Sequence, residues 1–152
     1  MHLPQVDPIH LHLALVHLPV LGMPAVLAAW VLAWRRDDSF WRRVFEAGWT
    51  GLTLAAAAAY YAGGAALERL QPTGGAPWPT LPLAENHATA GRAALIVLAL
   101  STAALLQAWM LERQGERPTG ARRAALGLGL AACLLLLTTA WLGGPVGHIE
   151  LR

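Results

Sequence analysis

The chain has 152 residues, of which 56% are hydrophobic and only 13% are charged. Soluble domains carry about 25% charged residues, so this composition excludes an ordinary soluble fold. The net charge of +2 and the isoelectric point of 9.3 do not indicate a nucleic-acid partner, because all eleven basic residues are arginines placed as a membrane topology requires.

Four apolar segments predict transmembrane helices over residues 10–34, 44–67, 87–111 and 123–143. About 20 apolar residues in a helix cross the hydrocarbon core of a bilayer. A helix also satisfies its own backbone hydrogen bonds there, which an isolated strand does not. We therefore predict an all-α fold, a transmembrane four-helix bundle that forms one membrane domain over residues 1–152. No internal repeat stands out in the sequence.

The arginines predict how the bundle is oriented. Eight lie in the links between segments one and two and between segments three and four, namely Arg35, Arg36, Arg42, Arg43, Arg113, Arg117, Arg122 and Arg123. The opposite side holds only Arg69, Arg92 and Arg152. The positive-inside rule then places both termini on the periplasmic side of a bacterial inner membrane, which the chain crosses several times.

Aromatic and proline residues fit the same arrangement. Interfacial belts are predicted from Trp30, Trp34, Trp41 and Trp109 on the inner side and from Trp78 and Trp141 on the outer side. The 68–86 loop contains four prolines and a Gly-Gly pair, so we expect it to be irregular and to cover the outer end of the bundle. Tyr60 and Tyr61 lie near the outer end of the second segment, either as belt residues or as hydrogen-bond donors into a site, and the belt is favoured.

Histidines gather at the predicted outer end. His10, His12 and His17 lie at the start of the first segment, His87 opens the third and His148 follows the fourth. His10 and His17 share a helix face about 10 Å apart in height, whereas His12 projects away from it. Ionisable groups at membrane depth are costly unless they are paired or liganded, so this grouping predicts a metal or haem site.

Imidazole binds haem iron, copper and zinc alike, and two features favour haem b. Histidines on facing helices of a four-helix bundle form a socket for a haem. Arg92, inside the third segment, suits a haem propionate, with snorkelling towards the headgroups as its alternative role. We predict His17 and His87 as the axial pair, with His12, His148 and His10 holding a second haem or supporting the first.

The run His12-Leu-Ala-Leu-Val-His17-Leu-Pro19-Val resembles the H-P-x-x-V-H-F-P-I signature that opens the DUF2231 family of small bacterial membrane proteins. The likeness extends to His87 and to the Gly143-Gly144 pair that closes the fourth segment. The chain departs from that pattern at Leu13, where the family often has proline, and in its ending. The resemblance implies a redox-associated protein with a b-type haem, since some members are joined to c-type cytochrome domains.

The predicted function is electron transfer near the periplasmic face by a non-catalytic subunit of a larger redox complex. Iron with two histidine ligands has no open position, so it passes electrons and does not activate oxygen. Expected partners are membrane lipid, other subunits, a periplasmic c-type cytochrome and membrane quinol. Two alternatives stay open: a copper- or zinc-binding membrane protein, which needs a polar path leading inward, and a structural anchor without a cofactor.

Overall fold

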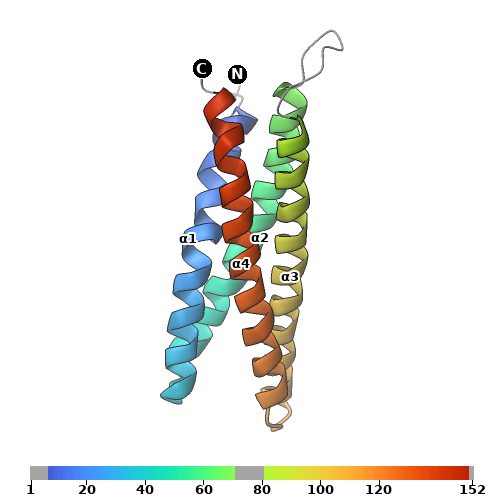
Figure 1. The fold of residues 1–152 in the computed structure, drawn as a ribbon. Helices are drawn as coiled ribbons and strands as arrows, with labels where there is room; N and C mark the ends of the chain where they lie inside the picture. The colour runs from blue at the N-terminus through green and yellow to red at the C-terminus, as the bar shows by residue number, and fades with distance from the viewer. Residues whose placement is uncertain (1–6, 71–80, 151–152) are drawn as a thin grey trace, which may run out of the picture.

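A computed structural model describes residues 7–70 and 81–150 of the chain, and the side chains of residues 7–69 and 82–144. These residues form four helices, α1 (Pro8–Arg35), α2 (Ser39–Leu70), α3 (Leu81–Arg113) and α4 (Thr119–Glu150). Successive helices run antiparallel, and the start of α1 lies at the same end of the bundle as the end of α4 (Figure 1). The predicted all-α fold of four helices is confirmed for this part of the chain.

Three of the helices in the described residues are long and apolar enough to cross a membrane, over Pro8–Arg35, Pro82–Arg113 and Thr119–Gly144. By these three helices the chain is a multi-pass membrane protein in contact with lipid. The prediction of four such spans is therefore confirmed for three. Helix α2 falls short because it mixes its alanines with glycines, threonines and charged residues. It nevertheless spans the bundle from the end of α1 to the start of α3 (Figure 1), and it packs chiefly on α1.

The helices extend beyond the predicted spans. The prediction that residues 68–86 are irregular is wrong at both ends, because α2 continues to Leu70 and α3 begins at Leu81. Pro82 is tolerated in the first turn of α3, where its missing N–H would have no partner within the helix. Helix α4 continues to Glu150, so its predicted end at residue 143 is also wrong. Residues 71–80, which include Trp78, lie outside the described residues.

Both helical hairpins reverse direction in the same way. The turn after α1 passes through Asp37 at φ 51°, and the turn after α3 passes through Gly115 at φ 77°. Each left-handed residue stands two positions beyond the end of its helix. At Asp37 the backbone N–H donates to the carbonyl of Trp34, and at Gly115 to that of Glu112, which satisfies a terminal carbonyl of the preceding helix.

Within each hairpin the two helices pack chiefly on each other, α1 on α2 and α3 on α4. The hydrophobic core follows the axis of the bundle. Its largest fully buried side chains include Met23, Trp30, Trp49 and Leu98. The prediction that Trp30 belongs to an interfacial belt is wrong: its Nε1 donates to Oε1 of Glu46 at 3.2 Å, which draws the indole inward. Trp141, which is 82% exposed, remains available to an outer belt.

Candidate functional site

Two histidines from diagonally opposed helices meet near the end of the bundle where α1 begins. The ring centres of His12, on α1, and His87, on α3, lie 6.1 Å apart with their planes at 89°. Both side chains are partly buried. At a rise of about 1.5 Å per residue, His12 and His87 stand roughly 6 Å and 9 Å from the starts of their helices.

Each imidazole is fixed by a hydrogen bond to the second helix of its own hairpin. Nδ1 of His12 lies 2.8 Å from the carbonyl oxygen of Ala59 on α2, and Nδ1 of His87 lies 2.8 Å from that of Thr139 on α4. A carbonyl oxygen can only accept, so Nδ1 is the donor in both pairs. In the neutral imidazole the lone pair is then on Nε2. Proteins orient metal-ligating histidines by this kind of bond.

Two glycines make room for the rings. A Cβ atom added to Gly63 would lie 2.9 Å from Nδ1 of His12, and one added to Gly143 would lie 2.8 Å from Cε1 of His87. The second glycine of each pair, Gly64 or Gly144, faces nothing within 4 Å. The first glycine of each Gly-Gly pair therefore forms the seat of an imidazole.

The two hairpins repeat one arrangement around this pair. In each hairpin a histidine near the start of the first helix bonds to a carbonyl on the second helix and packs on a glycine four residues beyond it. The carbonyl and glycine are those of Ala59 and Gly63 in one hairpin and of Thr139 and Gly143 in the other. The two hairpins thus share this arrangement of histidine, carbonyl and glycine although no repeat stands out in the sequence.

The structure brings His12, and not His17, to His87. Residues five apart on a helix are about 140° apart around its axis, so the turn that points His12 inward points His17 outward. His17 is exposed, and its Nδ1 lies 2.6 Å from the carbonyl oxygen of Leu13 in its own helix. The predicted axial pair therefore does not meet, whereas the predicted supporting residue His12 takes the inner position.

The remaining predicted histidines lie apart from this pair or outside the described side chains. His10 is exposed, and its Nδ1 lies 3.1 Å from a carboxylate oxygen of Asp7. His148 lies within α4 and does not follow its end as predicted, and its side chain is outside the described ones. His2 precedes the described residues.

Arg92 lies one turn beyond His87 and links the two hairpins. Its Nε donates to the hydroxyl of Tyr60 on α2 at 3.0 Å, and its side chain is exposed. Tyr60 directly follows Ala59, the acceptor of the His12 bond. Of the two roles predicted for Tyr60, the favoured belt role does not account for this bond; the alternative, a hydrogen-bonding role, is closer, although the hydroxyl here accepts.

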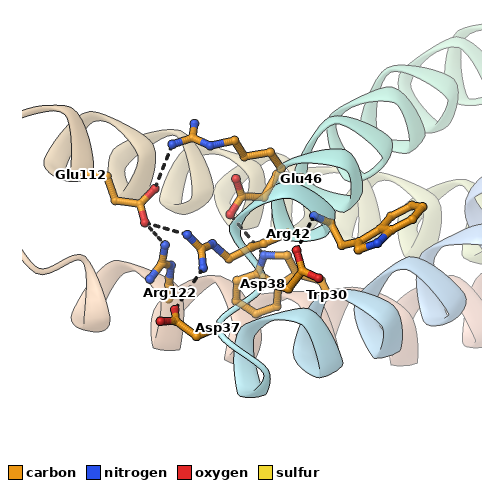
Figure 2. Close-up of polar contacts among 9 residues, drawn as sticks. Trp30, Asp37, Asp38, Arg42, Glu46, Glu112 and Arg122 are labelled. Atoms are coloured by element: carbon orange, nitrogen blue, oxygen red, sulfur yellow. Dashed lines mark hydrogen bonds and ion pairs between the residues drawn. The ribbon is translucent and has the colours of Figure 1, made fainter.

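An ionic cluster closes the opposite end of the bundle (Figure 2). The Glu112 carboxylate accepts from Arg42 at 3.1 Å and from Arg122, and Arg43 lies 3.8 Å from its other oxygen. Arg42 and Arg122 are buried. These arginines, predicted only to set orientation, thus also tie α2, α3 and α4 together. Sequence reasoning missed Glu112 because its partners are 10 and 70 residues away.

The histidine pair has no third ligand among the described side chains, where no group of three or more His, Cys, Asp or Glu residues lies close enough to hold a metal ion. Cys133, in α4, is buried and free. Comparisons with family models, curated proteins and solved structures found no match to this chain. The resemblance to the DUF2231 family therefore stays a prediction based on the residues quoted for it.

Proposed function

We propose that the chain binds one haem b through His12 and His87 and serves electron transfer in a membrane. The observation that carries this proposal is the pair of imidazoles, each with Nδ1 fixed on a carbonyl and its lone pair on Nε2. With a metal–nitrogen distance of about 2 Å on each side, two imidazoles that share one metal have ring centres roughly 6 Å apart. The 6.1 Å between the ring centres of His12 and His87 fits that requirement.

Two protein ligands suit haem better than they suit zinc. A structural zinc site takes four protein ligands, whereas a porphyrin supplies four of the six ligands of its iron. His12 and His87 would hold a bound haem, which would supply a one-electron couple. Arg92 lies five residues beyond His87 in α3 and donates to Tyr60 through Nε, and its terminal guanidinium nitrogens would bind a propionate.

The protein's own residues would tune such a site by position and charge. The carbonyls of Ala59 and Thr139 hold a proton on Nδ1 of each imidazole and orient the rings, which leaves Nε2 as the ligand atom and strengthens it. The pair stands near the end of the bundle where α1 begins. By the arginine distribution this is the periplasmic end, within reach of a periplasmic c-type cytochrome or of membrane quinol. We propose that the chain acts there as a subunit of a larger redox complex in the bacterial inner membrane.

The test is a reduced-minus-oxidised visible spectrum of the purified protein, with pyridine haemochrome quantitation, after expression with added haem. We expect a b-type spectrum with one haem per chain. His12→Ala and His87→Ala should each remove it, whereas His17→Ala, which changes an exposed imidazole on the same helix as His12, should retain it. Haem loss in His17→Ala together with retention in His12→Ala would restore the pairing predicted from sequence.

A colourless protein would turn the assignment to one of the two alternatives. Metal analysis on the same sample separates them. One copper per chain, lost in His12→Ala, would support copper binding, since imidazole is also a copper ligand. Absence of any metal would leave the two histidines as ties between helices in a structural anchor.

A further inference from the structure

A cavity between α2 and α3 lies towards the end of the bundle opposite the histidine pair. It has a volume of about 240 Å³ and stands where the two hairpins meet, because α2 belongs to the first hairpin and α3 to the second. These two helices pack less closely on each other than on their hairpin partners. Leu105, Leu106 and Trp109 form its α3 wall, and Leu106 is 50% exposed, so the cavity is accessible from the lipid side. We call it the inter-hairpin cavity.

The wall formed by α2 carries two opposite charges. Arg43 and Glu46 stand three positions apart, on one side of the helix, and both line the inter-hairpin cavity. The side chain of Arg43 is 52% exposed, and its nearest acidic partner among the described residues is Glu112, at 3.8 Å. Oε1 of Glu46 accepts from the indole of Trp30, whereas Oε2 accepts no hydrogen bond from a described side chain. A guanidinium and a carboxylate oxygen thus remain available in one cavity.

The two charges cancel, which determines the kind of ligand that fits. An anion bound to Arg43 would stand beside the carboxylate of Glu46, and a cation bound to Glu46 would stand beside the guanidinium, so each would be repelled. A zwitterion that carries a phosphate and an ammonium satisfies both groups. Guanidinium binds phosphate by paired, charge-assisted hydrogen bonds, and an ammonium donates such bonds to a carboxylate.

The inter-hairpin cavity also stands at the depth of lipid headgroups. Arg43 belongs to the second turn of α2, and Trp109 lies near the end of α3, where its ring packs under the guanidinium of Arg113 at 4.1 Å. Tryptophan and arginine mark the interface at the ends of membrane helices. Leu105 and Leu106 lie one turn deeper in α3, on the path that an acyl chain would follow from this interface.

We propose that the inter-hairpin cavity binds a zwitterionic aminophospholipid, phosphatidylethanolamine, with its phosphate on Arg43, its ammonium on Oε2 of Glu46 and one acyl chain along Leu106. A primary ammonium carries three N–H donors. The trimethylammonium of phosphatidylcholine has the same charge and no N–H donor, so the site should distinguish the two headgroups. The proposal does not depend on the histidine pair or on haem.

The experiment is native mass spectrometry of the detergent-purified full chain, titrated with lipids of identical acyl chains. The headgroups are ethanolamine, its N-methyl and N,N-dimethyl forms, choline and glycerol. We expect the affinity to fall with each N–H lost, to a total of about tenfold between ethanolamine and choline, the effect of one hydrogen bond to a charged group. Equal binding of phosphatidylethanolamine and phosphatidylcholine, or tighter binding of phosphatidylglycerol, would overturn the proposal.

Two variants separate the roles of the charges. Glu46→Gln keeps an oxygen for the indole of Trp30 but loses the carboxylate, so it should abolish the preference for ethanolamine over choline. Arg43→Gln should weaken both lipids about tenfold and leave their ratio unchanged, because both carry the phosphate. Glu116→Gln and Arg117→Gln, at exposed positions in the turn between α3 and α4, are the matched controls and should behave as the wild type. A preference retained in Glu46→Gln would contradict the proposed ammonium site.

A further pair of variants tests the cavity separately from the charges. Leu106→Trp fills the inter-hairpin cavity, whereas Leu100→Trp adds the same ring to an exposed leucine of α3 that does not line it. Phosphatidylethanolamine binding should fall only in Leu106→Trp. Equal losses in the two variants, or a quinone that Leu106→Trp displaces while phosphatidylethanolamine stays bound, would overturn the proposal. Circular dichroism of every variant checks folding, and Arg43→Gln with the headgroup series decides if Glu46→Gln is unfolded.

Discussion

The imidazole of His12 is fixed from two directions, by the carbonyl of Ala59 and by the bare backbone of Gly63. Neither contact is made by a side chain, so neither leaves a polar or charged residue that would reveal it in the sequence. The same holds for His87, with Thr139 and Gly143. The position of each ring thus depends on how close two helix backbones come.

A methyl group at Gly63 should displace the ring of His12. Gly63→Ala would place Cβ 2.9 Å from Nδ1, so the imidazole must turn away and lengthen its bond to Ala59. Overpacking of this kind costs about 1–3 kcal/mol. We expect a lower melting temperature and a weakened haem spectrum. Gly64→Ala, which meets nothing within 4 Å, is the matched control and should change neither.

The second hairpin offers the same comparison. Gly143→Ala should disturb His87, and Gly144→Ala should not, because the latter position is open. Identical spectra and melting temperatures for the two variants of either pair would contradict the role given to the first glycine.

The N-cap of α1 should make the first turn of that helix sensitive to acid. The backbone N–H of Ile9 donates to Asp7, and this bond, with help from His10, holds the pKa of the Asp7 carboxyl below its ordinary value of 3.8. Because the pKa of Asp7 is lower in the folded state, the charged cap stabilises the helix fully at pH values above the ordinary pKa. This stabilisation is lost as the pH falls through the pKa of the folded state.

Hydrogen-exchange protection factors of the amides of residues 9–11 measure this effect. They should fall as the pH drops below about 4, where the unfolded carboxyl begins to protonate. Asp7→Asn keeps a good capping side chain without a titrating group, so its protection should not vary with pH over that interval. The same acid-dependent loss in Asp7→Asn would exclude Asp7 as its source.

The site could be predicted from the sequence in its residue types but not in its pairing. Clustered histidines and the costs of membrane burial identified His12 and His87 as candidates. Choosing between His12 and His17 required knowing which face of α1 points inward. Leucines and alanines occur on every face of this helix, so the sequence does not mark the inward one. Because α1 has no polar face opposite an apolar one, the 3.6-residue periodicity of its sequence could not show which face points inward.

At the scale of the elements, helix number was predictable and helix ends were not. Hydropathy follows the apolar stretch of a segment, whereas hydrogen bonding carries a helix on through polar residues. For that reason α2 begins at Ser39 and α3 at Leu81, five and six residues before their predicted spans. Pro82 and the Gly143-Gly144 pair, which favoured breaks, lie inside helices: Pro82 stands in the first turn of α3, and Gly143 packs on the ring of His87.

Glu112 is the carboxylate through which three helices are tied together. Glu112→Gln should leave the buried guanidiniums of Arg42 and Arg122 without their shared partner. Removing one member of a buried ion pair costs about 3 kcal/mol at the lower end of the usual range. We expect a lower midpoint of thermal unfolding in detergent, with little change in helix content below it.

Glu116→Gln is the control for that experiment, because Glu116 is exposed in the turn between α3 and α4. It removes the same charge without touching the buried arginines. If the two variants unfold at the same temperature, the cluster in Figure 2 does not contribute to stability.

At the scale of the whole molecule, the arginine distribution and the antiparallel order of the helices make a joint prediction. Alkaline phosphatase is active only in the periplasm. Fusions after Arg152 should therefore be active, and insertions at Asp37 or at Gly115 should be inactive. If α2 failed to cross the membrane, a fusion within the 71–80 link would share the inactive side with Asp37. Activity in that link therefore tests α2 as a span as well as the orientation.

The repeat of one arrangement in both hairpins means that each hairpin holds half of the histidine pair. A chain of half this length could build the same pair as a homodimer, with two identical imidazoles related by a two-fold axis. Joining the halves in one polypeptide removes the requirement that they be identical. The fifth residue after the imidazole is His17 in the first half and Arg92 in the second. Fusion of the halves thus permits a cation on one side of the pair alone, an asymmetry that a symmetric dimer cannot have.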